Sequence, residues 1–327
     1  MVAFFTITKS LSHHIFKKPF LSPHFLESNS QKFNLFSIRT LILQSESSSV
    51  KLNKLTDLDS GIVEVNLDRP EAKNAIGKEM LRGLQNVFEA VYRDSSVNVM
   101  MICSSVPRVF CAGADLKERK MMSPSEVKDF VNSLRSTFAF LEGLHIPTIA
   151  VIEGAALGGG LEMALCCDLR ICGEDAKMAL PETGLAIIPG AGGTQRLPRL
   201  IGKSKAKELI YTGQKIYGRD ALDIGLVNHC VPAGEAHSKA LEVARAISQK
   251  GPLAIKMAKH AIDQGLEVDL TSGLDVEEDC YEKLLHTNDR LEGLAAFAEK
   301  RKPMYKEYGG KVRTLEYGGM NCGSLFT

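Results

Sequence analysis

The spacing of apolar residues predicts strands mixed with helices in the first two thirds of the chain. Ile62 to Leu67 is typical of a strand that ends at Asp68-Arg69-Pro70, and Val97 to Cys103 is typical of a buried strand. Between them, apolar side chains recur at the three- and four-residue spacing of one helix face: Met80, Leu81, Leu84, Val87, Phe88 and Val91.

A second helix start is marked by its capping residues. Ser123-Pro124-Ser125-Glu126 has the pattern of a capping box with proline in the first turn. Pro147 ends that segment, and a strand is expected at Thr148 to Ile152. The elements expected next are a short helix at Leu161 to Cys166 and short strands at Leu169 to Cys172 and Met178 to Leu180.

From about Ser204 onward the pattern is helical. The helices expected there are Lys205–Thr212, Glu235–Gln249, Leu253–Gln264, Leu270–Leu285 and Leu291–Lys300, the last opened by Asp289 and Glu292. Strands with helices first and helices alone later indicate an α/β core with a helical C-terminal extension. The glycine-rich residues 312–327 carry no periodic pattern, so we expect an unstructured tail.

The overall composition of the chain argues against several kinds of binding partner and site. The net charge of the 327 residues is only +1, so no global field favours nucleic acid or an acidic membrane. The 8 cysteines form no C-x-x-C pair, which indicates reduced thiols and argues against a zinc site or a disulfide framework. No apolar run is long enough to span a bilayer.

The first fifty residues differ from the rest. They are basic and rich in serine, and Glu27 is the only acid before Glu46. This composition is typical of an organelle transit peptide over residues 1–50, with the mitochondrion favoured and a plastid as the alternative. A terminal segment without a targeting role is the other interpretation.

Three consecutive glycines, 158–160, follow the strand at 148–152 and precede a helix. Glycine lets a backbone approach a ligand closely, and a helix start leaves N–H groups unpaired, so Gly159 is a candidate oxyanion donor. An ordinary tight turn is the alternative. Ala156 and Leu197 stand where a dinucleotide-binding motif and a P-loop each need glycine.

The segment 110–116 is a second place where small residues expose backbone. Cys111 within it has no nearby histidine, so a buried thiol is favoured over a nucleophile.

Two glutamates are candidates for acid–base chemistry. Glu162 lies in the expected first helical turn, and Glu182 lies between Pro181 and an apolar run. A carboxyl group in apolar surroundings, as expected for Glu182, has a raised pKa and can carry a proton near neutral pH. The alternatives are a helix-stabilising Glu162 and a solvated Glu182.

These motifs together resemble the enoyl-CoA hydratase/isomerase (crotonase) superfamily. The resemblance rests on Gly-Ala-Asp-Leu at 113–116, Ala-Leu-Gly-Gly-Gly-Leu-Glu at 156–162 and the segment 181–196, and it covers about Leu52 to Lys306. The branch that it most resembles contains mitochondrial enoyl-CoA hydratases and 3-methylglutaconyl-CoA hydratase. The fold implied is a spiral of ββα turns at 52–248, followed by a helical region at 249–311 that makes trimer contacts.

The resemblance also implies site residues. Amides matching Ala114 and Gly159 hold the thioester oxygen, and carboxyl groups matching Glu162 and Glu182 bind water and move protons. The resemblance places Ala112, Asp115 and Leu116 beside the CoA site. It also implies CoA contacts for Phe297 and Lys300, which in some members of the family come from a neighbouring subunit. No metal and no cofactor is implied, because CoA is part of the substrate.

The function implied is hydration of the 2,3 double bond of enoyl-CoA thioesters, by a homotrimer or homohexamer in the mitochondrial matrix. Hydration of 3-methylglutaconyl-CoA in leucine breakdown is the main alternative. RNA binding, known for a relative in that branch, needs a basic stripe, and the corresponding helix mixes Lys78, Arg82 and Arg93 with acids. A non-catalytic scaffold is disfavoured by the two glutamates and the glycine loop.

Overall fold

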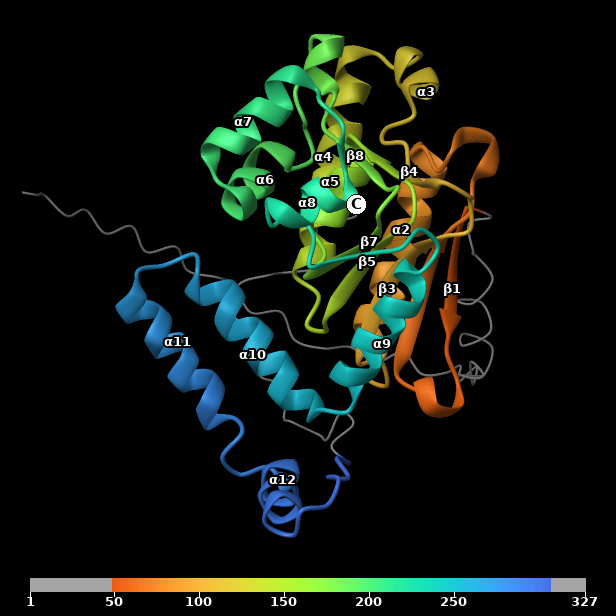
Figure 1. Ribbon diagram of the computed structural model, residues 1–327. Helices are drawn as coiled ribbons and strands as arrows, with labels where there is room; N and C mark the ends of the chain where they lie inside the picture. Colours follow the sequence, from red (N-terminus) through yellow and green to blue (C-terminus); the bar gives the residue numbers. More distant parts are fainter. Residues whose placement is uncertain (1–48, 307–327) are drawn as a thin grey trace, which may run out of the picture. The chain divides into compact units, whose positions relative to one another are not determined.

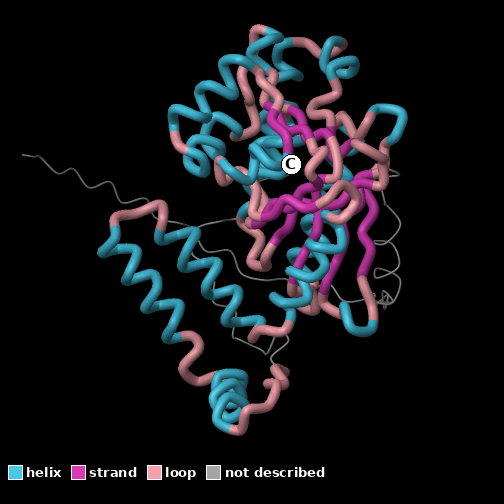
Figure 2. Tube along the Cα trace, viewed as in Figure 1, coloured by secondary structure: helices cyan, strands magenta, loops and turns pink. Residues whose placement is uncertain are grey.

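Two β-sheets form the framework of the computed structural model, which describes residues 49–306 (Figure 2). The larger sheet contains β1 (Val50–Lys54), β2 (Ile62–Leu67), β3 (Val99–Ser104), β5 (Thr148–Ile152), β7 (Leu169–Gly173) and β10 (His229–Val231), in that order. The smaller sheet contains β4 (Val109–Cys111), β6 (Ala155–Leu157), β8 (Lys177–Ala179) and β9 (Ile216–Tyr217). Neighbouring strands are parallel except for the pairs β1–β2 and β8–β9.

From β3 to β8, consecutive strands alternate between the two sheets, as the expected spiral of ββα turns requires. The pairs β3–β4, β5–β6 and β7–β8 each place one strand in the larger sheet and the next in the smaller. Gly154 joins β5 to β6, where a β-carbon would lie 2.0 Å from the carbonyl carbon of Arg108. Only glycine fits this crossing. The helices that follow the first two pairs are α3 (Leu116–Lys120), α4 (Pro124–Glu142) and α5 (Gly159–Leu165).

Helices cover both faces of the larger sheet. The apolar face of α2 (Lys78–Arg93) packs into the main core with α4, whose capping box forms as predicted: Ser123 Oγ accepts from Glu126 N and Glu126 Oε2 accepts from Ser123 N. The helix α9 (Ala236–Ser248) covers the opposite face (Figure 1), and every fourth residue that it turns toward the sheet is a buried alanine. These alanines, 236, 240 and 244, allow the helix to lie close to the strands.

The chain continues through shorter elements into three C-terminal helices. The shorter elements are η2 (Asp57–Asp59), η3 (Pro70–Ala72), η4 (Glu182–Leu185), α6 (Gly193–Ile201), α7 (Lys203–Thr212) and α8 (Gly218–Asp223). The last helices are α10 (Pro252–Gly265), α11 (Leu270–Glu282) and α12 (Asn288–Ala298). Gly265 and Gly273 let α10 and α11 approach closely. The Lys259 ammonium group of α10 ties this helix to the core by donating to Ile146 O at 3.2 Å and to the Asp168 carboxylate at 2.7 Å.

Two boundaries that differ from the sequence prediction concern the first strand and the last helix. Val50 already pairs with Leu67 in β1, so the folded chain begins two residues before the predicted Leu52. Thr287 caps α12 by accepting from Arg290 N, whereas Asp289 was expected to open that helix. The predicted leader, except Ser49 and Val50, and the predicted tail at 312–327 lie outside the described residues. No helix within 49–306 is long and apolar enough to cross a membrane.

Candidate active site

One cleft brings together both glycine loops and both predicted glutamates. Its volume is about 490 Å³, and its walls come from the loop before α3, from α3 itself, from α4, from the start of α5 and from residues 181–191. Glu162 and Glu182 are the acidic residues of its lining, and Arg119 and Arg135 are the basic ones. The other lining residues are Ala112, Gly113, Ala114, Leu116, Phe130, Val131, Leu134, Gly158, Gly159, Pro181, Leu185, Ile187, Ile188, Gly190 and Ala191.

Glu162 is held rigidly at the buried end of this cleft. Its side chain comes from the first turn of α5, and the residue is only 3% exposed. Oε1 accepts hydrogen bonds from the amides of Ala191 at 2.9 Å and Gly193 at 2.8 Å. Burial raises the pKa of Glu162, while the two amide bonds oppose that rise. The two donors stabilise the carboxylate and fix its position, which suits a group that must orient water.

Glu182 has a different environment. It opens η4 directly after Pro181, and its Oε2 atom is buried without a hydrogen-bond partner among residues 49–306. Burial is the largest cause that raises the pKa of Glu182 to about 7, and the charge of Glu162 raises it further. The backbone amide of Glu182 and the charge of Arg119 oppose the rise. A carboxyl group with this pKa carries a proton near neutral pH and can donate it.

Two backbone N–H groups meet where the glycine loops touch. A parallel bridge joins Ile76 to Ala114 through Ile76 N to Gly113 O (2.7 Å) and Asp115 N to Ile76 O (3.0 Å), which leaves the Ala114 N–H outside the bridge. Gly159 is the first residue of α5, so its N–H has no acceptor within the helix. Ala114 N lies 3.5 Å from the position of a β-carbon on Gly159. The two donors are therefore neighbours in the cleft wall.

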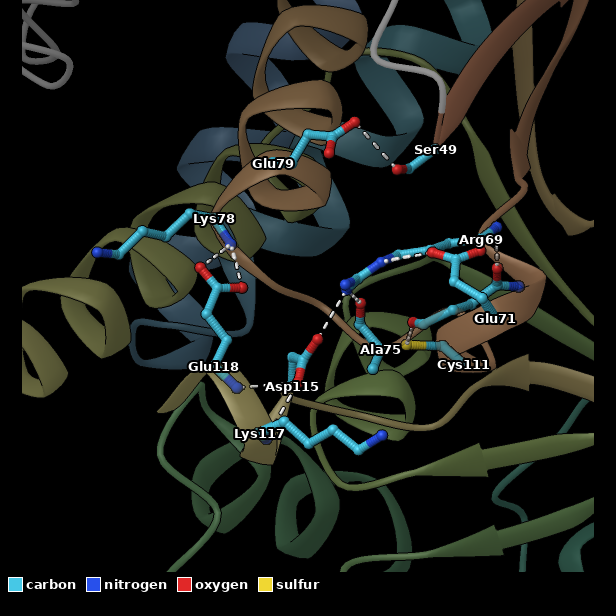
Figure 3. Close-up of polar contacts among 11 residues, drawn as sticks. Ser49, Arg69, Glu71, Ala75, Lys78, Glu79, Cys111, Asp115, Lys117 and Glu118 are labelled. Carbon is cyan, nitrogen blue, oxygen red and sulfur yellow. Dashed lines mark hydrogen bonds and ion pairs between the residues drawn. The ribbon is translucent and has the colours of Figure 1, made fainter. Parts of the chain in front are cut away.

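The loop that carries Ala114 is fixed by the next residue, Asp115 (Figure 3). The Asp115 carboxylate accepts from the amides of Lys117 and Glu118, both at 3.1 Å, and so caps α3. It also forms an ion pair with Arg69 at 2.9 Å, and Arg69 donates to Ala75 O at 2.8 Å. Asp115 does not belong to the cleft lining. The structure thus shows it holding the loop, and its predicted contact with CoA stays a prediction.

The remaining predicted residues divide into two groups. Ala112 and Leu116 line the cleft. Phe297, in α12, is 86% exposed, and Lys300 follows that helix with a φ of 54°. Neither belongs to the lining that the described residues form, so their contact with CoA, within or across subunits, stays a prediction.

Sequence reasoning did not find every residue of this site. It missed Arg119 and Arg135, and it did not identify Ala191 and Gly193 as the donors that hold Glu162. The glycine-rich run 190–193 was the available signal, because closely approaching amides need small residues. Cys111 is a buried thiol, as favoured: it donates to Asn74 O, and burial raises its pKa to about 12.

The site's chemistry defines a class of enzyme. Paired amide donors beside a fixed carboxylate and a proton-bearing carboxyl group suit addition to, or proton transfer within, an activated carbonyl compound. The family model described as Enoyl-CoA hydratase/isomerase matches residues 57–308. The chain therefore belongs to the enoyl-CoA hydratase/isomerase family.

Named relatives agree with this assignment. The chain is 68% identical to "Probable enoyl-CoA hydratase 2, mitochondrial" of Arabidopsis thaliana over 279 residues, which cover 85% of this chain and 93% of the relative. It is 48% identical to the mitochondrial methylglutaconyl-CoA hydratase of Homo sapiens over 79% of this chain and 77% of that protein. A crystal structure of an enoyl-CoA hydratase from Bacillus anthracis matches with a TM-score of 0.77 and 46% identity, covering 79% of this chain and 99% of the other. The structural match and the family match confirm the crotonase fold that the motifs predicted.

Proposed function

We propose that the protein adds water across the 2,3 double bond of enoyl-CoA thioesters. The observation that carries this proposal is the joint presence of Glu162, Glu182 and the amides of Ala114 and Gly159 in one cleft. Isomerisation needs proton transfer alone, whereas hydration also needs a group that activates water. Two carboxyl groups in contrasting environments provide both roles.

The two amides activate the substrate. When the thioester oxygen accepts hydrogen bonds from Ala114 N–H and Gly159 N–H, electron density leaves the conjugated double bond and C3 becomes electrophilic. The negative charge that develops on the oxygen during attack strengthens both bonds, so the amides stabilise the transition state more than the ground state. One such donor contributes on the order of 3 kcal/mol to lowering the barrier.

The two carboxyl groups complete the addition. Glu162, as carboxylate, takes a proton from water while the water oxygen bonds to C3. Glu182, as carboxylic acid, donates its proton to C2 as the enolate collapses to the thioester. The product is the 3-hydroxyacyl-CoA, and proton exchange with solvent returns Glu162 and Glu182 to their starting states.

Product analysis tests this proposal. Crotonyl-CoA should lose its conjugated absorbance on incubation with the protein and give 3-hydroxybutyryl-CoA. In ¹⁸O-labelled water the label should appear at C3, and in deuterated water one deuterium should appear at C2. A product with a shifted double bond and no added oxygen would instead indicate an isomerase.

The biological setting is part of the proposal. We place the enzyme in the mitochondrial matrix, in fatty acid or branched-chain amino acid breakdown, because similar proteins are named mitochondrial and the leader has the composition of a transit peptide. Assembly as a homotrimer or homohexamer is supported by large apolar side chains exposed on the last helices. These include Ile262, Leu266, Leu270, Leu274, Tyr281, Leu291 and Leu294. Light scattering after chromatography would measure the oligomer directly.

A further inference from the structure

Arg119 is a cation in the cleft wall that has no side-chain hydrogen bond or ion pair among residues 49–306. It lies in α3, close after the loop of Ala114, and is partly buried. Arg135, the other basic residue of the lining, differs because its guanidinium donates to Gly190 O at 2.9 and 3.2 Å. Arg119 therefore retains its donors for a ligand.

The surroundings of Arg119 favour an anion at this place. Much of the cleft lining is apolar, with Phe130, Val131, Leu134, Leu185, Ile187 and Ile188 among its residues. A guanidinium that is partly removed from water in such surroundings gains most from a charged acceptor, and its planar fork matches a carboxylate or a phosphate.

The position of Arg119 indicates which anionic group of a CoA thioester it binds. A CoA thioester offers phosphates at its nucleotide end and, in some substrates, a carboxylate at the far end of the acyl chain. The charge of Arg119 acts on Glu182, which serves C2 of the acyl chain, whereas the whole pantetheine arm separates the phosphates from the thioester. We propose that Arg119 is a specificity-determining residue that binds a distal carboxylate of the acyl chain, so that the enzyme favours enoyl-CoA thioesters of dicarboxylic acids.

This inference rests on the proposed hydration and adds a substrate class to it. It distinguishes two kinds of substrate, since a methylglutaconyl group carries such a carboxylate and a simple enoyl group does not. The preference should be visible as a ratio of kcat/KM values for an anionic and a neutral substrate of similar length.

The test compares glutaconyl-CoA with hex-2-enoyl-CoA. The wild-type protein should favour glutaconyl-CoA, and Arg119→Met should lower the glutaconyl-to-hexenoyl ratio of kcat/KM by about 10- to 100-fold, as expected for one charge-assisted hydrogen bond. Arg119→Lys, which keeps the charge and loses the fork, should fall between the two. Lys120→Met is the matched control: it removes the same charge from the neighbouring, exposed residue outside the cleft lining and should leave the ratio unchanged.

Three other outcomes would contradict a carboxylate-binding role for Arg119, and each has its own kinetic signature. A parallel rise in KM for both substrates in Arg119→Met would show that Arg119 binds a CoA phosphate. An equal loss of kcat for both would show an effect on Glu182 alone, and an unchanged ratio would show no role in selection. Failure of the wild-type protein to hydrate either substrate would contradict the proposed function itself. Thermal unfolding of each variant identifies losses caused by misfolding.

Discussion

The carboxyl group of Glu182 lies directly against Gly158: Oε1 is 2.8 Å from the position that a β-carbon on Gly158 would occupy. Gly158 also has a φ of 52° and precedes Gly159, the proposed oxyanion donor. The absence of a side chain at this position therefore has two consequences. It permits the backbone turn that starts α5, and it leaves space for the Glu182 carboxyl group.

Gly158→Ala should reduce hydration strongly, because the new methyl group displaces the Glu182 carboxyl group. The backbone strain should also cost about 1–3 kcal/mol of stability. Gly225→Ala is the matched control, since Gly225 has a φ of 75° and no atom within 4 Å of its added β-carbon. The control should lose stability and retain activity. Equal activities of the two variants, measured at a temperature where both are folded, would contradict this account of Gly158.

The rate of hydration should depend on the protonation of Glu182. The pKa of Glu182 is raised to about 7, mainly by burial, and only the protonated form can donate to C2. Above that pH, kcat/KM should fall by about tenfold per pH unit. The pH profile of initial rates measures this, and the residual rate of Glu182→Gln should lack the same transition. A wild-type rate that stays level well above pH 7 would assign the proton to another group.

Protein stability should also depend on the protonation of Glu182. Between the ordinary pKa of 4.5 and the raised value of about 7, the folded protein keeps Glu182 protonated while the unfolded chain ionises. The folded state therefore binds more protons in this window, and its free energy of unfolding should fall as pH rises. Denaturant titrations below pH 4.5 and above pH 7 should show a larger fall for the wild type than for Glu182→Gln. An identical fall in both proteins would rule out a raised pKa at Glu182.

The ion pair between Arg69 and Asp115 should matter for catalysis through the position of Ala114. Asp115→Ala removes both the α3 cap and this ion pair, which should cost about 0.5–2 kcal/mol of stability for the cap and lower kcat more than it raises KM. Glu71→Ala is a suitable control, because Glu71 also pairs with Arg69 but its side chain is largely exposed and does not cap α3. Steady-state kinetics of the two variants separate these effects. A change confined to KM would instead support the predicted contact between Asp115 and CoA.

Local signals in the sequence were sufficient for elements that their own residues determine. The Ser123 capping box and the apolar face of α2 each depend on residues within one or two turns, and both form where predicted. The strands β4 and β6 were missed: each has three residues, too few to show a period, although β8, equally short, was predicted within one residue of its position. Their existence depends on pairing with each other across the spiral, which short-range patterns do not encode.

The same distinction applies to the site. The resemblance identified the two glutamates and the two amides, and the structure brings all four into one cleft. The amides that hold Glu162 come from positions 29 and 31 residues later in the chain, so no local spacing could reveal them. Arg119 has no motif of its own, and its significance appears only when its surroundings are known.

The most direct test of the central claim is the rate at which Glu162→Gln and Glu182→Gln hydrate crotonyl-CoA. Glutamine keeps the size of each side chain and, at position 162, an oxygen that can still accept from Ala191 and Gly193, so both variants should fold. Each should nevertheless lose about 10²- to 10⁴-fold in kcat, because one can no longer take a proton from water and the other can no longer donate one to carbon. Turnover close to the wild-type rate in either variant would contradict a mechanism in which both carboxyl groups move protons.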